Sequence, residues 1–135
     1  MNLAKLMIPK VFIVLLHEKN TIRQGLEVLT RCSYTAIPVL DENECYIGSV
    51  SEGDFLQHIL KTGTTNMKDQ EAYLIRDILR RDFCPALSIA AEFDVVVDAA
   101  LRQNFVPVVD DRQALCGIIT RRNLMAAMAE SQKGE

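Results

Sequence analysis

Long hydrophobic runs and an excess of positive charge are both missing from this sequence. No apolar run approaches the ~20 residues of a membrane span. The 135 residues carry 15 Lys and Arg against 18 Asp and Glu, a net charge of −3. Nucleic-acid binders need a basic surface to neutralise phosphates, so this balance argues against that class. The apolar stretch 1–16 is interrupted by Pro9, includes Lys5 and Lys10, and has no cleavage pattern after it, which predicts folded protein and no signal peptide.

Paired cysteines and catalytic motifs are also missing. None of the four cysteines forms a C-x-x-C pair, and their apolar neighbours favour reduced thiols in a cytoplasm. His17 and His58 have no cysteine or carboxylate at metal-ligand spacing. No P-loop, G-x-S-x-G or H-E-x-x-H pattern occurs. The sequence therefore predicts a protein without catalytic activity, metal or cofactor.

An internal repeat is the strongest feature that is present. Ile37-Pro38-Val39-Leu40-Asp41 recurs 69 positions later as Val106-Pro107-Val108-Val109-Asp110, and Gly48-Ser49-Val50-Ser51 recurs in the same register as Gly117-Ile118-Ile119-Thr120. Asp54 is matched by Asn123. A repeat of this length indicates two copies of one supersecondary unit that bury their faces together. Two similar units also predict two similar sites.

Hydrophobic periodicity and turn residues predict the same element order in both copies. The first copy is predicted to contain a short helix before Pro9, strand 11–16, helix 22–29 after the N-cap Thr21, strands 34–40 and 45–50, and helix 52–61. The second is predicted to contain helix 73–81, strand 86–89, helix 95–102, strands 105–109 and 115–119, and helix 123–129. The expected boundaries are repeat 1 at 1–61, a linker at 62–72, repeat 2 at 73–130 and a frayed tail at 131–135.

These motifs resemble a tandem pair of cystathionine-β-synthase (CBS) domains, also called a Bateman module. The resemblance rests on the apolar-Pro-Val-apolar-Asp strand and the following Gly-apolar-apolar-Ser/Thr-x-x-Asp/Asn turn, present as 37–54 and 106–123. It implies an α/β (α+β) fold with pseudo-twofold symmetry, each half running helix–strand–helix–strand–strand–helix. The segments 34–41 and 117–122 are similar to those of small stand-alone CBS proteins of Gram-positive bacteria that bind cyclic di-AMP.

The first strand-to-helix corner offers a hydroxyl and a carboxylate. A helix N-terminus presents free N–H groups that suit a phosphate, and Ser51 adds a hydroxyl there. Asp54 is able to accept hydrogen bonds from the 2′ and 3′ hydroxyls of a ribose. The alternative is that Ser51 merely caps the helix. Because capping is assigned to Ser51, we expect Asp54→Ala to leave the stability of the ligand-free protein nearly unchanged.

The second corner, Thr120-Arg121-Arg122-Asn123, is dicationic. Asn123 replaces the family's Asp, which weakens the case for an ordinary AMP or ATP site. Arg121 and Arg122 are predicted to bind the phosphates of a cyclic dinucleotide, because a guanidinium matches phosphate oxygens bidentately. The alternative is a pair of solvated surface arginines.

The strands before each corner are predicted to form the walls of the site. Tyr34 offers a ring that stacks on a purine, and Thr35 and Ala36 are placed to contact a base edge, although an ordinary strand start explains them equally well. Lys10 is a candidate phosphate contact, and a lone lysine is usually a surface residue. The resemblance adds apolar walls at Pro38, Phe105, Val106 and Pro107, and along the first strands at 11–13, which ends at Ile13, and 86–88.

The resemblance implies a non-catalytic regulatory module that binds cyclic di-AMP in a cleft between the repeats. The alternatives are a sensor of AMP, ADP or ATP, and a structural subunit whose clefts are empty. A cytoplasmic homodimer is expected, paired through apolar helix faces at 26–29 and 55–59. The expected partner is a metabolic or (p)ppGpp-synthesising enzyme, and neither nucleic acid nor a membrane is expected to bind.

Overall fold

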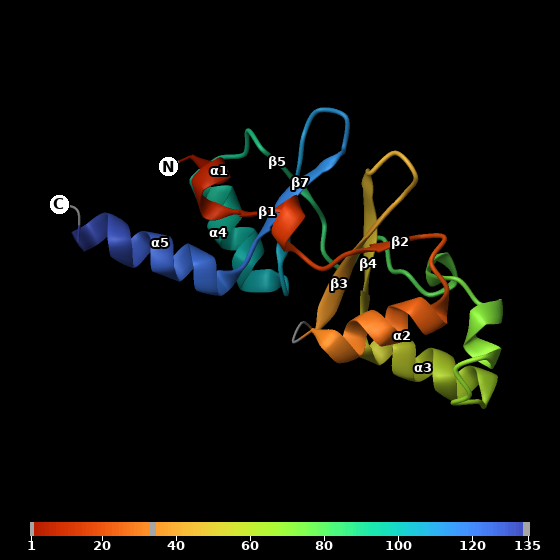
Figure 1. Cartoon of the computed structure of the whole chain (residues 1–135). Coiled ribbons are helices and arrows are strands. Elements are labelled where there is room, and N and C mark those ends of the chain that lie inside the picture. The colour runs from red at the N-terminus through yellow and green to blue at the C-terminus, as the bar shows by residue number, and fades with distance from the viewer. Residues whose placement is uncertain (1, 33–34, 134–135) are drawn as a thin grey trace. The chain divides into compact units, whose positions relative to one another are not determined.

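The chain forms two compact units, and each unit combines segments from both sequence copies (Figure 1). The computed structural model describes residues 2–32 and 35–133. Unit 1 comprises Met1–Ile13 and Cys84–Glu135, and unit 2 comprises Val14–Phe83. The start of the first copy therefore folds with the second copy, and the segment that opens the second copy folds with the first.

Unit 2 is a three-stranded sheet covered by two helices. Its strands are β2 (Leu16–His17), β3 (Ala36–Leu40) and β4 (Tyr46–Ser51), in the order β2-β3-β4. β2 is parallel to β3, and β3 is antiparallel to β4. The helices are α2 (Ile22–Arg31) and α3 (Glu52–Thr62). Every residue of β3 is buried, and the core around it contains Ile22, Phe55 and Ile75.

Unit 1 has the same plan with an added edge strand. Its sheet has the order β1-β7-β6-β5, where β1 is Ile8–Pro9, β5 is Leu87–Ser88, β6 is Val106–Val109 and β7 is Leu115–Ile119. Its helices are α1 (Leu3–Leu6), α4 (Phe93–Arg102) and α5 (Arg121–Lys133). Their buried faces meet the sheet in a core that includes Leu6, Val96 and Leu124. The predicted α/β (α+β) class is confirmed.

A short edge segment completes each sheet beside a glycine. In unit 1, Ile8 pairs with Ile118 and Pro9 with Gly117. In unit 2, Arg80 and Ser49 exchange both backbone hydrogen bonds, at 2.9 and 3.0 Å. A Cβ on Gly48 would lie 2.6 Å from the Arg80 carbonyl oxygen. Glycine at this position therefore lets the edge segment approach β4.

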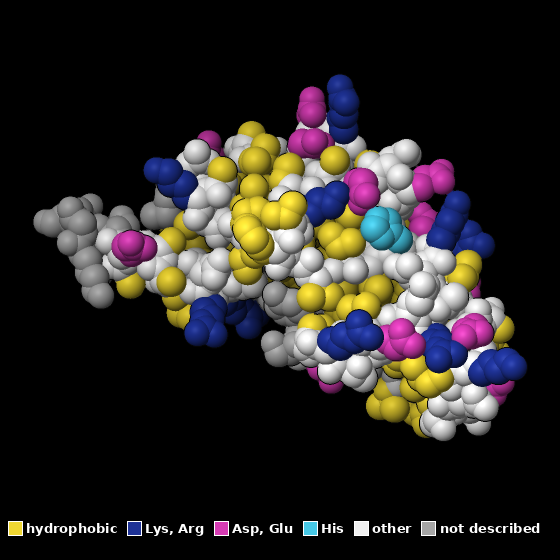
Figure 2. All heavy atoms as spheres, in the orientation of Figure 1, with side chains coloured by type: hydrophobic (Ala, Val, Ile, Leu, Met, Phe, Trp, Pro, Cys, Tyr) yellow, Lys and Arg dark blue, Asp and Glu magenta, His cyan; other side chains and the backbone are white. Residues whose placement is uncertain are grey.

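Two predicted elements are wrong. The expected strand 11–16 is a 3₁₀ turn, η1 (Lys10–Phe12), followed only later by β2. Pro9 lacks the N–H that would continue the ladder, so the chain turns out of the sheet there. Val11 and Phe12 are consequently 83% and 75% exposed, not buried. Hydrophobic side chains reach the surface around this turn (Figure 2).

The expected helix 73–81 is also wrong. Only one 3₁₀ turn forms there, η3 (Ile75–Asp77), and the following backbone pairs with Ser49. Edge pairing with β4 overrides the local helical pattern, because it satisfies backbone groups that a helix would satisfy internally. The other predicted helices and strands are present with ends shifted by a few residues. α5 continues to Lys133, into the segment expected to fray, and 134–135 lie outside the described residues.

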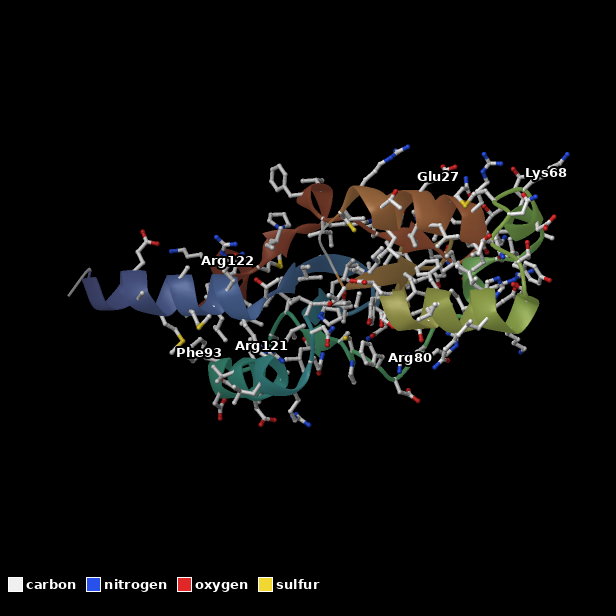
Figure 3. The ribbon with its side chains drawn as sticks, turned by 90° about the horizontal axis from the view of Figure 1, so that it is seen from below. Glu27, Lys68, Arg80, Phe93, Arg121 and Arg122 are labelled. Carbon is white, nitrogen blue, oxygen red and sulfur yellow. The ribbon has the colours of Figure 1, made fainter. Side chains whose placement is uncertain are left out.

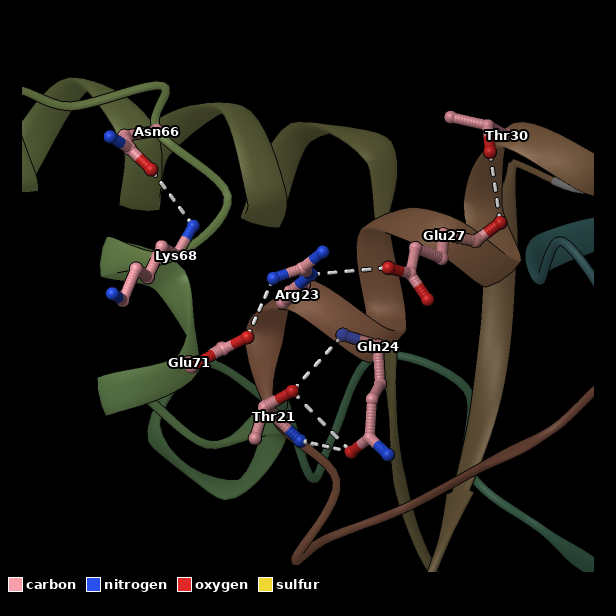
Figure 4. Close-up of polar contacts among 8 residues, drawn as sticks. All are labelled: Thr21, Arg23, Gln24, Glu27, Thr30, Asn66, Lys68 and Glu71. Carbon is pink, nitrogen blue, oxygen red and sulfur yellow. Dashed lines mark hydrogen bonds and ion pairs between the residues drawn. The ribbon is translucent and has the colours of Figure 1, made fainter.

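The linker is fixed to α2 by charged contacts (Figure 4). Arg23 Nη1 lies 2.6 Å from Glu71 Oε1 in η2 (Asp69–Ala72), and Arg23 Nε lies 3.2 Å from Glu27 Oε1. Hydrogen bonds to Glu27 and then Glu71 raise the pKa of Arg23 above its ordinary value. A capping box between Thr21 and Gln24 starts α2, as expected for Thr21. The linker is therefore part of unit 2.

Gly48→Ala tests the edge contact in unit 2. The added methyl group has to displace backbone at Arg80, so we expect about 2 kcal/mol lower free energy of unfolding in urea. Gly53→Ala is the matched control, because its Cβ would meet only Ser51 Oγ at 3.7 Å in α3. Equal stability of the two variants would contradict the role given to Gly48.

Candidate functional site

The first corner is a closed set of hydrogen bonds at the start of α3. Asp54 Oδ2 accepts from the Ser51 backbone N–H at 2.8 Å and from its Oγ at 3.0 Å, and Ser51 Oγ accepts from the Asp54 N–H at 3.3 Å. Arg80 Nε lies 3.0 Å from Asp54 Oδ1, and the Asp54 side chain is only 12% exposed. Asp54 is therefore a structural residue as well as a candidate ligand contact. The expectation that capping falls to Ser51 alone is wrong.

The walls predicted for this corner lie beside it in the sheet. Ala36 pairs with Ser51 and Pro38 with Ser49 across β3 and β4. The Thr35 carbonyl oxygen accepts from the Glu52 N–H at 3.1 Å, which places Thr35 at the N-terminus of α3. Tyr34 lies outside the described residues. Ala36 and Pro38 are buried, so Thr35 is the exposed member of this group.

The second corner also has a helix cap, but Asn123 stands where the first corner has Asp54. Thr120 Oγ1 accepts from the Asn123 N–H at 3.1 Å, so Thr120 caps α5. Val106 pairs with Ile119 and Pro107 with Ile118, which places the buried Phe105 next to Thr120 at the end of the sheet. The structure thus assembles Phe105, Val106, Pro107 and the residues 120–123 within unit 1.

The two arginines of the second corner have different environments. Arg121 Nε donates to the Ala100 carbonyl oxygen at 2.6 Å, and its Nη2 donates to the Gln103 carbonyl oxygen at 3.1 Å. These are the last carbonyls of α4, which a cation stabilises. Arg121 therefore serves the packing of α4 against α5, and its guanidinium is engaged before any ligand arrives.

Arg122 lies on the other side of α5 (Figure 3). It is exposed, and among residues 2–32 and 35–133 its guanidinium has neither a hydrogen bond nor an ion pair. It stands at the N-terminus of α5, where the helix dipole also favours an anion. Arg122 is thus the free cation of the second corner.

Lys10 and Ile13 do not join the second corner through the sheet. Pro9 pairs with Gly117, so Lys10 follows toward the beginning of β7, whereas Thr120 follows its end. Burial raises the pKa of the Cys116 thiol, nearby Asp110 raises it further, and Lys10 opposes both. Lys10 therefore acts near Cys116. Ile13 is half-buried at the last position of the N-terminal part of unit 1.

A hollow of about 630 Å³ opens beside Asp54 within unit 2. It is lined by Asp54, Gln57, His58, Lys61, Thr62, Tyr73, Asp77, Ile78 and Arg80. His58 Nε2 lies 2.7 Å from the Oε1 of the buried Gln70, and its ring meets Tyr73 edge-on at 4.8 Å. These contacts fix the linker against α3, which explains why His58 is buried.

Sequence reasoning missed Arg80, and it included Phe12 only as part of the wall segment 11–13. Arg80 reaches Asp54 from 26 positions away, and no local motif marks such a contact. Phe12 was interpreted as a strand residue, and its exposure follows only from the turn after Pro9. A comparison of the residues that precede each repeat's first strand would have drawn attention to both positions.

A family model supplies the independent evidence. The CBS domain model matches residues 3–61 and 75–130. The chain belongs to the CBS-domain family. Its two matched segments are the two CBS sequence repeats. The opening segment of the first repeat belongs to unit 1, and the opening segment of the second repeat belongs to unit 2.

Relatives of this CBS protein include nucleotide-binding examples. Cyclic di-AMP receptor B of Bacillus subtilis is 28% identical over 103 residues, covering 76% of this chain and 69% of the relative. The CbpB protein of Listeria monocytogenes, solved in complex with c-di-AMP, is 27% identical with a TM-score of 0.83 over 100% of both chains. CBSX2, solved in complex with AMP, is 23% identical with a TM-score of 0.73, covering 94% of this chain and 95% of that one.

Two features are absent from the described part of the chain. No group of three or more His, Cys, Asp or Glu side chains is arranged to hold a metal ion there. Among the same residues, no helix combines the length and apolar composition needed to cross a membrane. Cys32, Cys45, Cys84 and Cys116 all lie among the described residues, and none of them forms a disulfide there.

Asp54→Ala tests the corrected role of the first corner. It removes the carboxylate that accepts from the Ser51 N–H and pairs with Arg80, so we expect a loss of about 1–2 kcal/mol in the free energy of unfolding without ligand. Urea titration followed by circular dichroism measures the loss. Asp111→Ala is the control, because Asp111 lies exposed in the turn before β7. A urea midpoint of Asp54→Ala equal to that of the wild type would instead support the expectation that Ser51 alone caps the helix.

Proposed function

We propose that this chain is a non-catalytic, cytoplasmic regulatory module that binds cyclic di-AMP and signals to a partner enzyme. The observation that carries the proposal is the second corner, where Arg122 is a free, exposed guanidinium at the N-terminus of α5 beside the Thr120 hydroxyl. The c-di-AMP-binding relatives from Bacillus subtilis and Listeria monocytogenes support it.

The chemistry of the second corner suits a phosphodiester better than a free ribose. A guanidinium and a helix N-terminus both attract the anionic phosphate. Asn123 carries no charge, so it adds no repulsion to that phosphate. A cyclic dinucleotide has no free 3′ hydroxyl and does not need the carboxylate that the family places at this position.

Phe12 supports the same assignment. An apolar ring that is 75% exposed has no role in either core, and stacking on an adenine would remove it from water. It belongs to unit 1, the unit that also contains Arg122. We therefore keep Phe12 and the neighbouring Val11 among the candidate ligand contacts, as exposed turn residues in place of strand residues.

AMP, ADP or ATP is the second candidate, because Asp54 is the kind of acceptor that a free ribose needs. A subunit that binds no nucleotide is the third. A thermal-shift series with AMP, ATP, cyclic di-AMP and cyclic di-GMP separates them. A ligand present at 100 times its Kd should stabilise by ~2.7 kcal/mol, and an absence of any shift would support the third candidate.

Arg122→Ala tests the phosphate contact. We expect the affinity for cyclic di-AMP to fall by about 2 kcal/mol, the scale of one charged hydrogen bond, with unchanged stability of the ligand-free protein. Calorimetry at two salt concentrations measures both the loss and its screening. Arg112→Ala is a control on another exposed arginine of unit 1. Arg121→Ala is unsuitable as a binding test, because it also removes the contacts to α4. Wild-type affinity in Arg122→Ala would refute the assignment.

A homodimer is part of the proposal, and the structure changes the face that would form it. Phe55 is buried in the core of unit 2, and Leu26 and Leu29 pack against that core, so the faces named from the sequence are already used. Leu56 and Leu60 of α3 are 57% and 72% exposed and replace them. An exposed apolar face of this kind is typical of an interface. A metabolic or (p)ppGpp-synthesising enzyme remains the proposed target of the dimer.

Light scattering at micromolar concentration tests the dimer. We expect twice the chain mass for the wild type and the monomer mass for the double variant Leu56→Glu with Leu60→Glu, because charge on both sides disfavours pairing. Gln57→Glu is the control, since it adds a charge of the same sign on the same helix at a position that is already polar and exposed. A monomeric wild type would exclude the proposed dimer.

A further inference from the structure

The two corners differ in the residue that the edge segment places beside them, and this residue lies outside the aligned part of the repeat. Ser49 and Ile118 are equivalent by the repeat, and each pairs with an edge segment. The residue opposite Ser49 is Arg80, and the residue opposite Ile118 is Ile8. The edge segment therefore supplies an arginine beside the first corner, where Asp54 lies, and an isoleucine beside the second, where Asn123 lies. The cation from the edge segment pairs with the carboxylate of the first corner.

Arg80 is held in place from three directions. Its backbone N–H and carbonyl oxygen are both hydrogen-bonded to Ser49. Its guanidinium carbon lies 3.9 Å above the centre of the Phe83 ring, within the range of a cation–π contact. Its Nε lies 3.0 Å from Asp54 Oδ1 and 3.3 Å from Oδ2. Its Nη2 lies 3.4 Å from Ser51 Oγ.

This arrangement engages both oxygens of the Asp54 carboxylate. Oδ2 already accepts from the Ser51 N–H and Oγ, and Arg80 covers the remaining side at both oxygens. A ribose that bound here would have to displace the guanidinium from a carboxylate that is 12% exposed. Breaking such a partly buried charge pair leaves a charge uncompensated.

We propose that Arg80 is a specificity-determining residue that closes the first corner to the ribose of a mononucleoside. The ion pair replaces the two ribose hydroxyls as the partner of Asp54. The chain therefore responds to nucleotides through the second corner alone, although the first corner carries the more family-like residues. This inference goes beyond the proposed function and does not depend on which ligand the second corner binds.

Adenosine is the probe, because it presents both ribose hydroxyls and has no phosphate for Arg122. Arg80→Met removes the charge and keeps the apolar contact with Phe83, and Arg80→Ile copies the matched position of unit 1. By calorimetry we expect either variant to bind adenosine at least tenfold more tightly than the wild type. Adding Asp54→Asn to either variant should abolish the gain. Arg81→Met is the matched control, since Arg81 is the exposed neighbour, and it should bind like the wild type.

A measurement on the wild type covers the case in which the Arg80 variants fail to fold. Arg80 is 48% exposed, so salt should weaken its pairing with Asp54. On addition of adenosine, the amide chemical shifts of Ser51 and Asp54 should stay unchanged at low salt and should move at high salt. Shifts at low salt, an absence of shifts at high salt, or wild-type adenosine affinity in a folded Arg80→Met protein would each overturn the proposal.

Discussion

The structure depends on the close approach of an edge segment to a glycine in each sheet. β7 reaches the backbone of Ile8 at Gly117, and β4 reaches the backbone of Arg80 at Gly48. A side chain at either glycine would push the edge away, because the ideal Cβ position is occupied by a carbonyl group. The exchange of segments between the repeats follows from these contacts, since each repeat obtains its edge from the other repeat's leading segment.

The exchange also decides what each corner contains. Helix caps at Ser51 and Thr120 are equivalent, and they would give equivalent anion sites if nothing else differed. The edge segment brings Arg80 to the first corner and Ile8 to the second. An ion pair is present at one and absent at the other as a result. Two copies of one unit thereby acquire different chemistry without any change in backbone plan.

The candidate ligand contacts are the groups that the fold leaves without a structural role. Arg121 donates hydrogen bonds to the end of α4, and Asp54 accepts from Ser51 and pairs with Arg80. Arg122 and the ring of Phe12 have no comparable role in the described fold. A charged group that already has partners gives up those contacts when it binds a ligand, so free groups are the better candidates.

The sequence by itself determined the repeat, the α/β class, the family and the two strand-to-helix corners, because these depend on periodicity and on motifs within 20 residues of each other. It also identified Thr120 and Arg122 as candidates. It could not show that Arg80 pairs with Asp54, that Arg121 faces α4, or that Val11 and Phe12 are exposed. Only the tertiary structure decided those points, because each depends on a segment distant in sequence whose approach is set by backbone pairing and close packing, which local patterns do not encode.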